Sequence, residues 1–248
     1  MCDDYMIPAD VLVGELCCRW WLVRLFECRL SSSGLCLEVL RRERPFPNCG
    51  MASVLGVVDP PEYVDFLIAV QPYNPRSRRL NPSCMTMLID HYKIDDRRLN
   101  SSYAYPIAMA MALLVKAYKE RIGYFDVITY VPAHPNELRR DEKTKELYNH
   151  TELLAVLFQE FLGELARPVE SLLIKVQAVK FKDKTKEERF ALAEKIYALS
   201  NKPVSVFGKS ILLIDDISTS GATLRACAKI LKEAGARRVI GVVAGKTR

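Results

Sequence analysis

Two acidic residues stand side by side directly after an apolar segment near the carboxyl end of the chain. Residues 211–214 read Ile-Leu-Leu-Ile, and Asp215 and Asp216 follow them. Carboxylates at the end of a buried strand can accept hydrogen bonds from the hydroxyl pair of a ribose, as in other nucleotide-binding α/β folds. An acidic residue at a strand end can also simply cap a turn. Two in succession, followed by a hydroxyl-rich loop, favour the ribose-binding interpretation.

The residues that follow are suited to a phosphate group. Four hydroxyl side chains, a glycine and an alanine make up this loop: Ser218, Thr219, Ser220, Gly221, Ala222 and Thr223. The glycine lets an anion approach the backbone, and the helix predicted from Thr223 adds unpaired N–H groups and the positive end of its dipole. The carboxylates and the loop together predict a site for a ribose 5-phosphate.

A parallel sheet would bring such strand ends together. From residue 104 the chain alternates segments of helical and strand character, which predicts an α/β fold with a mainly parallel sheet and helices on both faces. The predicted helices are 104–121, 146–165, 187–199 and 223–234, and the predicted strands are 126–131, 172–176, 210–214 and 239–243.

The segment from Asp215 to Thr223 resembles the phosphoribosyl pyrophosphate (PRPP) motif of the type I phosphoribosyltransferases, with Ser220 in place of a threonine. The resemblance implies an enzyme with the fold of that superfamily. Such an enzyme would bind PRPP and Mg²⁺, transfer ribose 5-phosphate to a nitrogen acceptor (a nucleobase or an amine) and release pyrophosphate. Asp215 and Asp216 would then be catalytic and stabilise positive charge on the sugar ring as the leaving group departs. No residue is assigned as a direct metal ligand.

An earlier part of the chain resembles the ComF family of competence-associated phosphoribosyltransferases. Residues 131–135, Val-Pro-Ala-His-Pro, and residues 148–154, Tyr-Asn-His-Thr-Glu-Leu-Leu, carry this resemblance. Residues 146–150 depart from the family's Arg-Gly-Phe-Asn-Gln, and the charged stretch 139–145 is longer than the family loop. Because ComF proteins are associated with competence, the alternative function is a non-catalytic PRPP- or nucleotide-binding protein, or a DNA-uptake accessory protein.

The superfamily binds pyrophosphate in a loop after an earlier strand, which corresponds here to residues 132–140. His134, Arg139 and Arg140 are the candidate pyrophosphate ligands. Guanidinium groups can neutralise phosphate oxygens, with Mg²⁺ bridging pyrophosphate and ribose oxygens. A solvated charged turn is the alternative for the two arginines, and His134 would then merely end the strand.

Residues 85–103 and 177–190 are the candidates for the segment that selects the acceptor. In the second of these, Glu188 and Arg189 match half of a family pattern, but Leu192 stands where the family has an asparagine. No function is therefore carried over to Arg189. An ordinary exposed loop is favoured for the lysine-rich part of this segment.

Composition changes near residue 85. Seven of the eight cysteines precede it, and Lys93 is the single lysine among the first 100 residues. We therefore predict a less regular, cysteine-rich N-terminal extension (1–84) and a phosphoribosyltransferase-like domain (85–248). ComF-like chains often open with zinc-binding Cys-x-x-Cys pairs, but the cysteines here are adjacent or isolated, which favours unpaired thiols. A further hypothesis is that translation starts at Met85 or Met87.

Charge is also unevenly spread, within a net charge of +6. Residues 1–100 carry 12 Lys+Arg against 13 Asp+Glu, a net −1, and residues 101–248 carry 24 against 17, a net +7. The basic part contains the phosphate motif, as expected of a protein that attracts polyanionic small molecules. Nucleic acid is the alternative partner, although no basic stripe with interspersed aromatic residues supports it.

Membrane association is not expected. The longest apolar run, 107–115, is far below the roughly 20 residues that span a bilayer, and the N-terminus lacks a basic signal-peptide start. We expect a cytoplasmic protein that forms a homo-oligomer.

Overall fold

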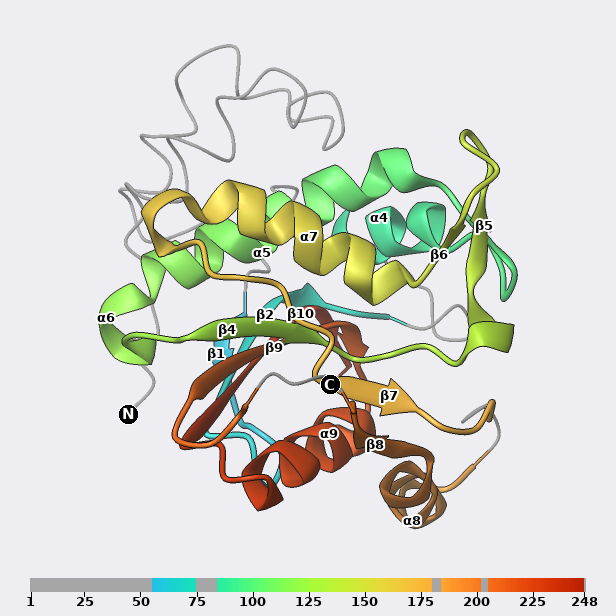
Figure 1. Ribbon diagram of the computed structural model, residues 1–248. Coiled ribbons are helices and arrows are strands. Elements are labelled where there is room, and N and C mark those ends of the chain that lie inside the picture. Colours follow the sequence, from blue (N-terminus) through green and yellow to red (C-terminus); the bar gives the residue numbers. More distant parts are fainter. Residues whose placement is uncertain (1–54, 75–83, 180–183, 202–204, 248) are drawn as a thin grey trace, which may run out of the picture.

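The computed structural model describes residues 55–74, 84–179, 184–201 and 205–247. Its centre is a five-stranded sheet with the strand order β1-β2-β10-β9-β4 (Figure 1). β1 runs antiparallel to β2, and all other neighbours in this sheet are parallel. The strands are β1 (Gly56–Val58), β2 (Phe66–Pro72), β4 (Val127–Tyr130), β9 (Ser210–Ser218) and β10 (Arg238–Lys246).

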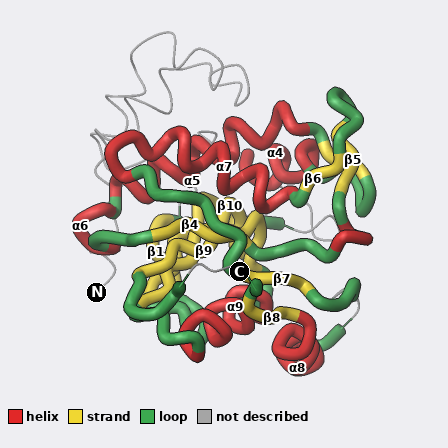
Figure 2. The backbone as a smooth tube through the Cα atoms, in the orientation of Figure 1, coloured by secondary structure: helices red, strands yellow, loops and turns green. Residues whose placement is uncertain are grey.

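Helices cover both faces of the central sheet (Figure 2). One face packs against α4 (Cys84–Tyr92), α5 (Ala104–Ala117) and α7 (His150–Leu162). The other face packs against α9 (Ala222–Glu233), and α8 (Lys186–Ile196) packs against α9. This arrangement confirms the predicted α/β class with a mainly parallel sheet. Every helix within the described ranges falls short of the length and apolarity that a membrane crossing requires.

Shorter elements complete the described fold. A three-stranded sheet joins β3 (Arg98–Leu99), β5 (Arg139–Asp141) and β6 (Leu147–Tyr148), and β7 (Leu173–Lys175) pairs with β8 (Tyr197–Leu199). The short helices are α6 (Lys119–Ile122) and the 3₁₀ turns Ser101–Tyr103, Pro135–Glu137 and Gly163–Leu165.

The central strands form because their apolar residues are buried on both faces. In β10, Ile240 and Val242 face the cluster under α4, α5 and α7, whereas Val239 and Val243 face the cluster under α9. Neighbouring residues of a strand point to opposite faces, so a strand covered on both sides reads as one continuous run of mostly β-branched residues. The residues 211–214 of β9 are fully buried for the same reason.

Strand β9 is longer than predicted. The predicted strand 210–214 continues to Ser218, so Asp215 and Asp216 lie within the strand. Backbone pairing with β10 reaches as far as Ser218, opposite Lys246. The acidic pair is therefore held by sheet hydrogen bonds and not by a loop.

Two helix predictions need correction at their ends. The predicted helix 146–165 begins at His150, because the Asn149 side chain accepts a hydrogen bond from the Thr151 N–H (3.2 Å) and caps α7. Residues 197–199, predicted as helix, form β8 because β7 lies alongside as a partner strand. The strand predicted at 172–176 exists as β7, but it pairs with β8 outside the central sheet.

The central sheet begins upstream of the predicted boundary at residue 85. β2 pairs along its length with β10, from Phe66 opposite Ile240 to Pro72 opposite Lys246. The start of the sheet therefore does not coincide with the composition change, and a chain starting at Met85 or Met87 would lack two strands of the sheet. The cysteines considered for zinc binding, at positions 17, 18, 28, 36 and 49, lie outside the described residues.

We expect Ile68→Ala to lower the free energy of unfolding by about 2–5 kcal/mol, the usual cost of truncating a fully buried isoleucine. Ile68 lies in β2 with none of its surface exposed. Ile174→Ala removes the same atoms from a side chain that is 39% exposed, and should cost much less. Urea denaturation of both variants checks this. Equal losses would show that β2 is not part of the cooperative core.

Candidate functional site

A cavity of about 370 Å³ lies beyond the carboxyl ends of β4 and β9. Its wall combines residues that are far apart in sequence: Lys93 after α4, Val131–Ala133 after β4, Arg139, the start of α7, Lys175, Tyr197 and the end of β9. Carboxyl ends of parallel strands are the usual place for a ligand crevice in such folds. The cavity therefore lies at the end of the strand that carries the acidic pair.

Asp215 and Asp216 both border this cavity and are buried, with 6% and 4% of their surface exposed. Their orientation is fixed locally. The Asp216 N–H donates to Asp215 Oδ1 (2.9 Å), and the Ile217 N–H donates to Asp216 Oδ1 (2.8 Å). As neighbours in a strand they face different layers: Asp216 lies beside Lys93 and His150, whereas Asp215 lies on the side of Tyr197 and Cys227.

The two carboxyl groups differ in their affinity for a proton. Burial, followed by the charge of Asp216, raises the pKa of Asp215 well above its usual range. Burial alone would raise the pKa of Asp216 too, but the ammonium of Lys93, which pairs with Asp216 Oδ2, and the guanidinium of Arg139 hold it below its ordinary value. Asp216 therefore keeps its negative charge, and Asp215 releases its proton less readily.

His150, the first residue of α7, is a neutral neighbour of this pair. Burial lowers the pKa of His150 to about 3, so its imidazole is uncharged at neutral pH. His150 Nε2 lies 3.6 Å from Asp216 Oδ2, which is longer than a hydrogen bond. The contact is therefore one of packing and not an ion pair.

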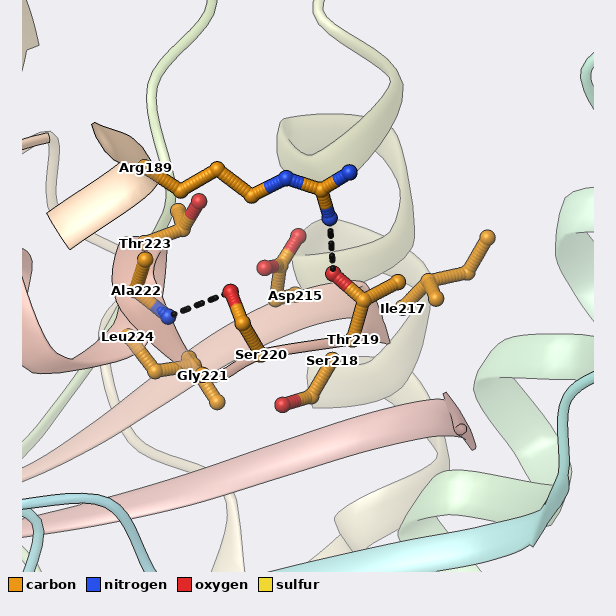
Figure 3. Close-up of a pocket in the computed structure, with 10 residues that line it drawn as sticks. All are labelled: Arg189, Asp215, Ile217, Ser218, Thr219, Ser220, Gly221, Ala222, Thr223 and Leu224. Atoms are coloured by element: carbon orange, nitrogen blue, oxygen red, sulfur yellow. Dashed lines mark hydrogen bonds between the residues drawn. The ribbon is translucent and has the colours of Figure 1, made fainter. Parts of the chain in front are cut away.

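The hydroxyl-rich loop encloses a second, smaller pocket of about 60 Å³ (Figure 3). It adjoins the larger cavity, because Asp215, Ile217, Thr219 and Thr223 line both. Gly221 adopts φ +80°, a left-handed conformation that favours glycine, and its position ahead of α9 leaves the first N–H groups of that helix at the pocket.

One basic residue borders the smaller pocket from another part of the chain. Arg189 of α8 donates from Nη1 to Thr219 Oγ1 (3.5 Å) (Figure 3). Its Nε donates to the Lys184 carbonyl (3.0 Å). No carboxylate among the described residues forms a salt bridge with it. A guanidinium that has no carboxylate partner in the described part of the chain and lies beside a helix N-terminus favours an anion. The sequence alone assigned Arg189 no function, although Glu188 and Arg189 match half of a pattern of the resembling family.

The predicted pyrophosphate residues separate in the structure. Arg139 borders the large cavity, together with the acidic pair. Arg140 is exposed and donates from Nη1 to the Lys145 carbonyl (2.7 Å). His134 caps the turn Pro135–Glu137, where its Nδ1 accepts from the Asn136 N–H (3.1 Å). Neither His134 nor Arg140 is among the described residues that line the cavity.

Glu137 and Lys175 are cavity residues that sequence reasoning missed. Lys175 Nζ donates to both carboxylate oxygens of Glu137 (2.8 and 2.6 Å), and Glu137 also accepts from the Val179 N–H (3.2 Å). These contacts tie the loop after β4 to the segment after β7. No local pattern indicates such a pair, because its members are 38 residues apart.

Unsatisfied polar atoms gather at this site. Five buried side-chain atoms in the described part of the chain have no hydrogen-bond partner, and three of them, Arg139 Nε, His150 Nδ1 and Ser218 Oγ, belong to residues that line the two pockets. A buried polar atom without a partner costs about 1–3 kcal/mol. Groups of this kind are satisfied when a polar ligand or water binds.

The donor set fits a divalent cation only in combination with a ligand. No three His, Cys, Asp or Glu side chains of the described chain are arranged to hold a metal ion. Mg²⁺ is commonly bound by one or two carboxylates together with phosphate oxygens and water. Asp215 and Asp216 could supply that protein share, so a magnesium ion would have to enter together with a polyphosphate.

Residues 159–246 match the phosphoribosyl transferase domain family. The matched part contains the acidic pair, the hydroxyl-rich loop and Arg189, and it ends at Lys246, the last residue of β10. The loop after β4 lies outside it. A search among curated proteins by sequence gave no match.

Solved structures provide three further similarities. A hypoxanthine phosphoribosyltransferase from Staphylococcus aureus is 10% identical, with a TM-score of 0.37, over 66% of this chain and 71% of that chain. A hypoxanthine-guanine phosphoribosyltransferase from Bacillus anthracis is 11% identical, with a TM-score of 0.34, over 60% of this chain and 70% of that chain. Glutamine PRPP amidotransferase from B. subtilis is 22% identical, with a TM-score of 0.33, over 59% of this chain and 31% of the amidotransferase. The chain therefore spans about a third of the length of that enzyme.

Proposed function

We propose that this chain is a type I phosphoribosyltransferase, which binds PRPP with Mg²⁺ and transfers ribose 5-phosphate to a nitrogen acceptor with release of pyrophosphate. One observation carries the proposal. The acidic pair and the hydroxyl-rich loop occupy one strand and the turn after it, and they border two adjoining pockets at the carboxyl edge of a parallel sheet. The domain match over residues 159–246 supports the same assignment.

The two pockets divide the ligand between them. The 5-phosphate would lie in the smaller pocket, where the N-terminus of α9, the loop hydroxyls and Arg189 supply donors and positive charge. The ribose hydroxyls would donate to Asp215 and Asp216. The pyrophosphate would extend into the larger cavity, towards Arg139.

The proposed reaction is a displacement at the anomeric carbon. The acceptor nitrogen forms a bond to that carbon while the bond to the pyrophosphate oxygen breaks, and the bonding electron pair leaves with pyrophosphate. The nitrogen loses its proton to solvent. Positive charge develops on the ribose ring, and the charged carboxylate of Asp216 is held where it can stabilise that charge. Arg139 would neutralise the departing oxygens. Mg²⁺, when bound with PRPP, supplies further positive charge to the same oxygens.

We further propose that the chain is related to the ComF family within this superfamily. The residues that carry the resemblance contribute to the cavity: Val131, Pro132 and Ala133 line it, and so do His150 and Thr151 at the start of α7. Thr151 Oγ1 donates to the Val131 carbonyl (2.5 Å) and so joins the two resembling segments.

Calorimetric titration of PRPP, with and without Mg²⁺, tests the proposed function, followed by an assay of pyrophosphate release with a panel of nucleobases and amines. We expect Mg²⁺-dependent binding and release of pyrophosphate with at least one acceptor. Binding without release across the panel would favour the non-catalytic PRPP-binding protein. Absence of binding would contradict the proposal.

We expect Arg189→Met to weaken ribose 5-phosphate binding about 10-fold, because a hydrogen bond to a charged group contributes about 1.5–3 kcal/mol and Arg189 is partly exposed. Arg98→Met is the matched control, since Arg98 is exposed and pairs with Asp95 and Glu142 on the surface. Calorimetry with ribose 5-phosphate measures both variants. An unchanged affinity for Arg189→Met would remove Arg189 from the phosphate site.

A further inference from the structure

An ion pair occupies the site in the free protein. Lys93 Nζ contacts Asp216 Oδ2 across 123 residues of sequence. The Asp216 side chain is 6% exposed and that of Lys93 is 22% exposed. The carboxylate that the proposed function assigns to the ribose hydroxyls therefore already has a cationic partner.

The position of Lys93 distinguishes its ion pair with Asp216 from an ion pair that only stabilises the fold. Its backbone N–H donates to the Ile89 carbonyl (2.8 Å) at the end of α4, so its main chain is anchored there. Its side chain borders the cavity, as Asp216 does. A lysine carries its charge on a flexible four-carbon stem, so the ammonium can move within the cavity while the backbone stays in place.

Ligand binding would set up a competition at Asp216. A ribose hydroxyl that donates to Asp216 Oδ2 must displace or share the Lys93 ammonium. An ammonium displaced without a new anionic partner in a partly buried cavity is unfavourable. Of the other acidic residues that line the cavity, Glu137 is already paired with Lys175, Asp96 is exposed to solvent, and Asp215 favours its protonated form. A pyrophosphate group entering the same cavity would bring several anionic oxygens, and would be the strongest available partner.

We propose that Lys93 exchanges partners when PRPP binds, leaving Asp216 to the ribose hydroxyls and contacting the pyrophosphate oxygens. This inference rests on the proposed function and adds a specificity-determining residue to it. A ligand with a pyrophosphate gains a new contact with Lys93, whereas ribose 5-phosphate must displace the ammonium and offers no anion in the large cavity. Lys93 would thus make the site prefer PRPP over ribose 5-phosphate.

The test measures two ligands against one substitution. In Lys93→Met we expect the dissociation constant for PRPP to rise about 10-fold or more, the effect of losing one charge-assisted hydrogen bond. The dissociation constant for ribose 5-phosphate should stay the same or fall, because no ammonium has to be displaced. Calorimetry at one Mg²⁺ concentration gives both values. Lys119→Met is the control. The Lys119 side chain is 60% exposed, and its Nζ lies 3.9 Å from Glu120 Oε1 on the surface.

Each other result has a defined meaning. If the substitution weakens the binding of both ligands equally, Lys93 has a purely structural role. If it tightens the binding of both equally, Lys93 is only a competitor for Asp216. If neither dissociation constant changes, Lys93 does not take part in the site. Each of these three results overturns the exchange. If the wild type binds neither ligand, the proposed function itself fails and the exchange fails with it. Lys93→Gln repeats the test if Lys93→Met does not fold, and Lys93→Arg, which keeps the charge, should retain the preference for PRPP.

Discussion

Replacing both Asp215 and Asp216 by asparagine is expected to reduce the affinity for PRPP at least about 100-fold while the fold is kept. Two hydrogen bonds from ribose hydroxyls would be weakened: the one to the charged carboxylate of Asp216 contributes about 1.5–3 kcal/mol, and the one to Asp215 contributes about 1 kcal/mol. Under the proposed function, transferase activity should fall at least as far, because Asp216 would also stabilise the charge that develops on the ribose ring. Calorimetry with PRPP and Mg²⁺ measures the affinity, and circular dichroism checks the fold.

The fold should survive this double substitution for a local reason. Asp215 Oδ1 and Asp216 Oδ1 accept hydrogen bonds from the next backbone N–H groups, at 2.9 and 2.8 Å, and an asparagine oxygen can accept the same bonds. Lys93 loses its charged partner, which costs some stability, but its side chain is 22% exposed, so water can solvate the ammonium without unfolding of the sheet.

The single substitutions should not be equal. Because the pKa of Asp215 is raised by burial and by Asp216, a neutral asparagine resembles the form that Asp215 favours. Asp216 is charged, so Asp216→Asn should have the larger effect on PRPP affinity. An unchanged affinity in the double variant would remove the central claim about this site.

Gly221→Val is expected to weaken the binding of both PRPP and ribose 5-phosphate about 100-fold. Gly221 has φ +80°, where a β-branched residue is strongly disfavoured, and a Cβ there would lie 3.0 Å from Pro61 Cβ. The loop would have to change conformation, which would turn its backbone N–H groups away from the position proposed for the 5-phosphate. Loss of two such charge-assisted bonds corresponds to about 3 kcal/mol.

Gly208→Val is the matched control for this prediction. Gly208 also has a left-handed φ, of +72°, but a Cβ there meets no atom within 4 Å, and Gly208 does not line either pocket. Both variants should lose about 1–2 kcal/mol of stability from backbone strain. Only Gly221→Val should lose ligand affinity. Equal affinities in the two variants would contradict the placement of the phosphate.

Pro61 shows that the amino-terminal part of the sheet reaches the hydroxyl-rich loop. It lies between β1 and β2, upstream of residue 85, and it packs against Gly221 at the start of α9. The composition change near residue 85 gave no indication of this contact, because lysine and cysteine content does not report on strand pairing. The pairing of β2 with β10 depends on surfaces that are remote in sequence.

The sequence alone determined the elements whose signals are local. Strands β4, β9 and β10 are contiguous apolar runs, which predicts strands that are buried on both faces. Helix α9 has apolar residues at helical spacing, which predicts a helix that is buried on one face. The acidic pair and the hydroxyl-rich loop are equally local, since they occupy residues 215–223 without interruption. Hence the fold class and the expected ligand followed from neighbouring residues.

Tertiary structure alone decided which distant side chains join these elements. Lys93, Arg139, Lys175 and Arg189 come from four separate segments, the end of α4, β5, β7 and α8, and long-range packing of these segments brings the four side chains to the carboxyl edge of the sheet. The same packing leaves His134 and Arg140 outside the cavity, although both lie in the predicted loop. Charged residues carry no periodic signal, so their partners depend on long-range packing that sequence spacing does not encode.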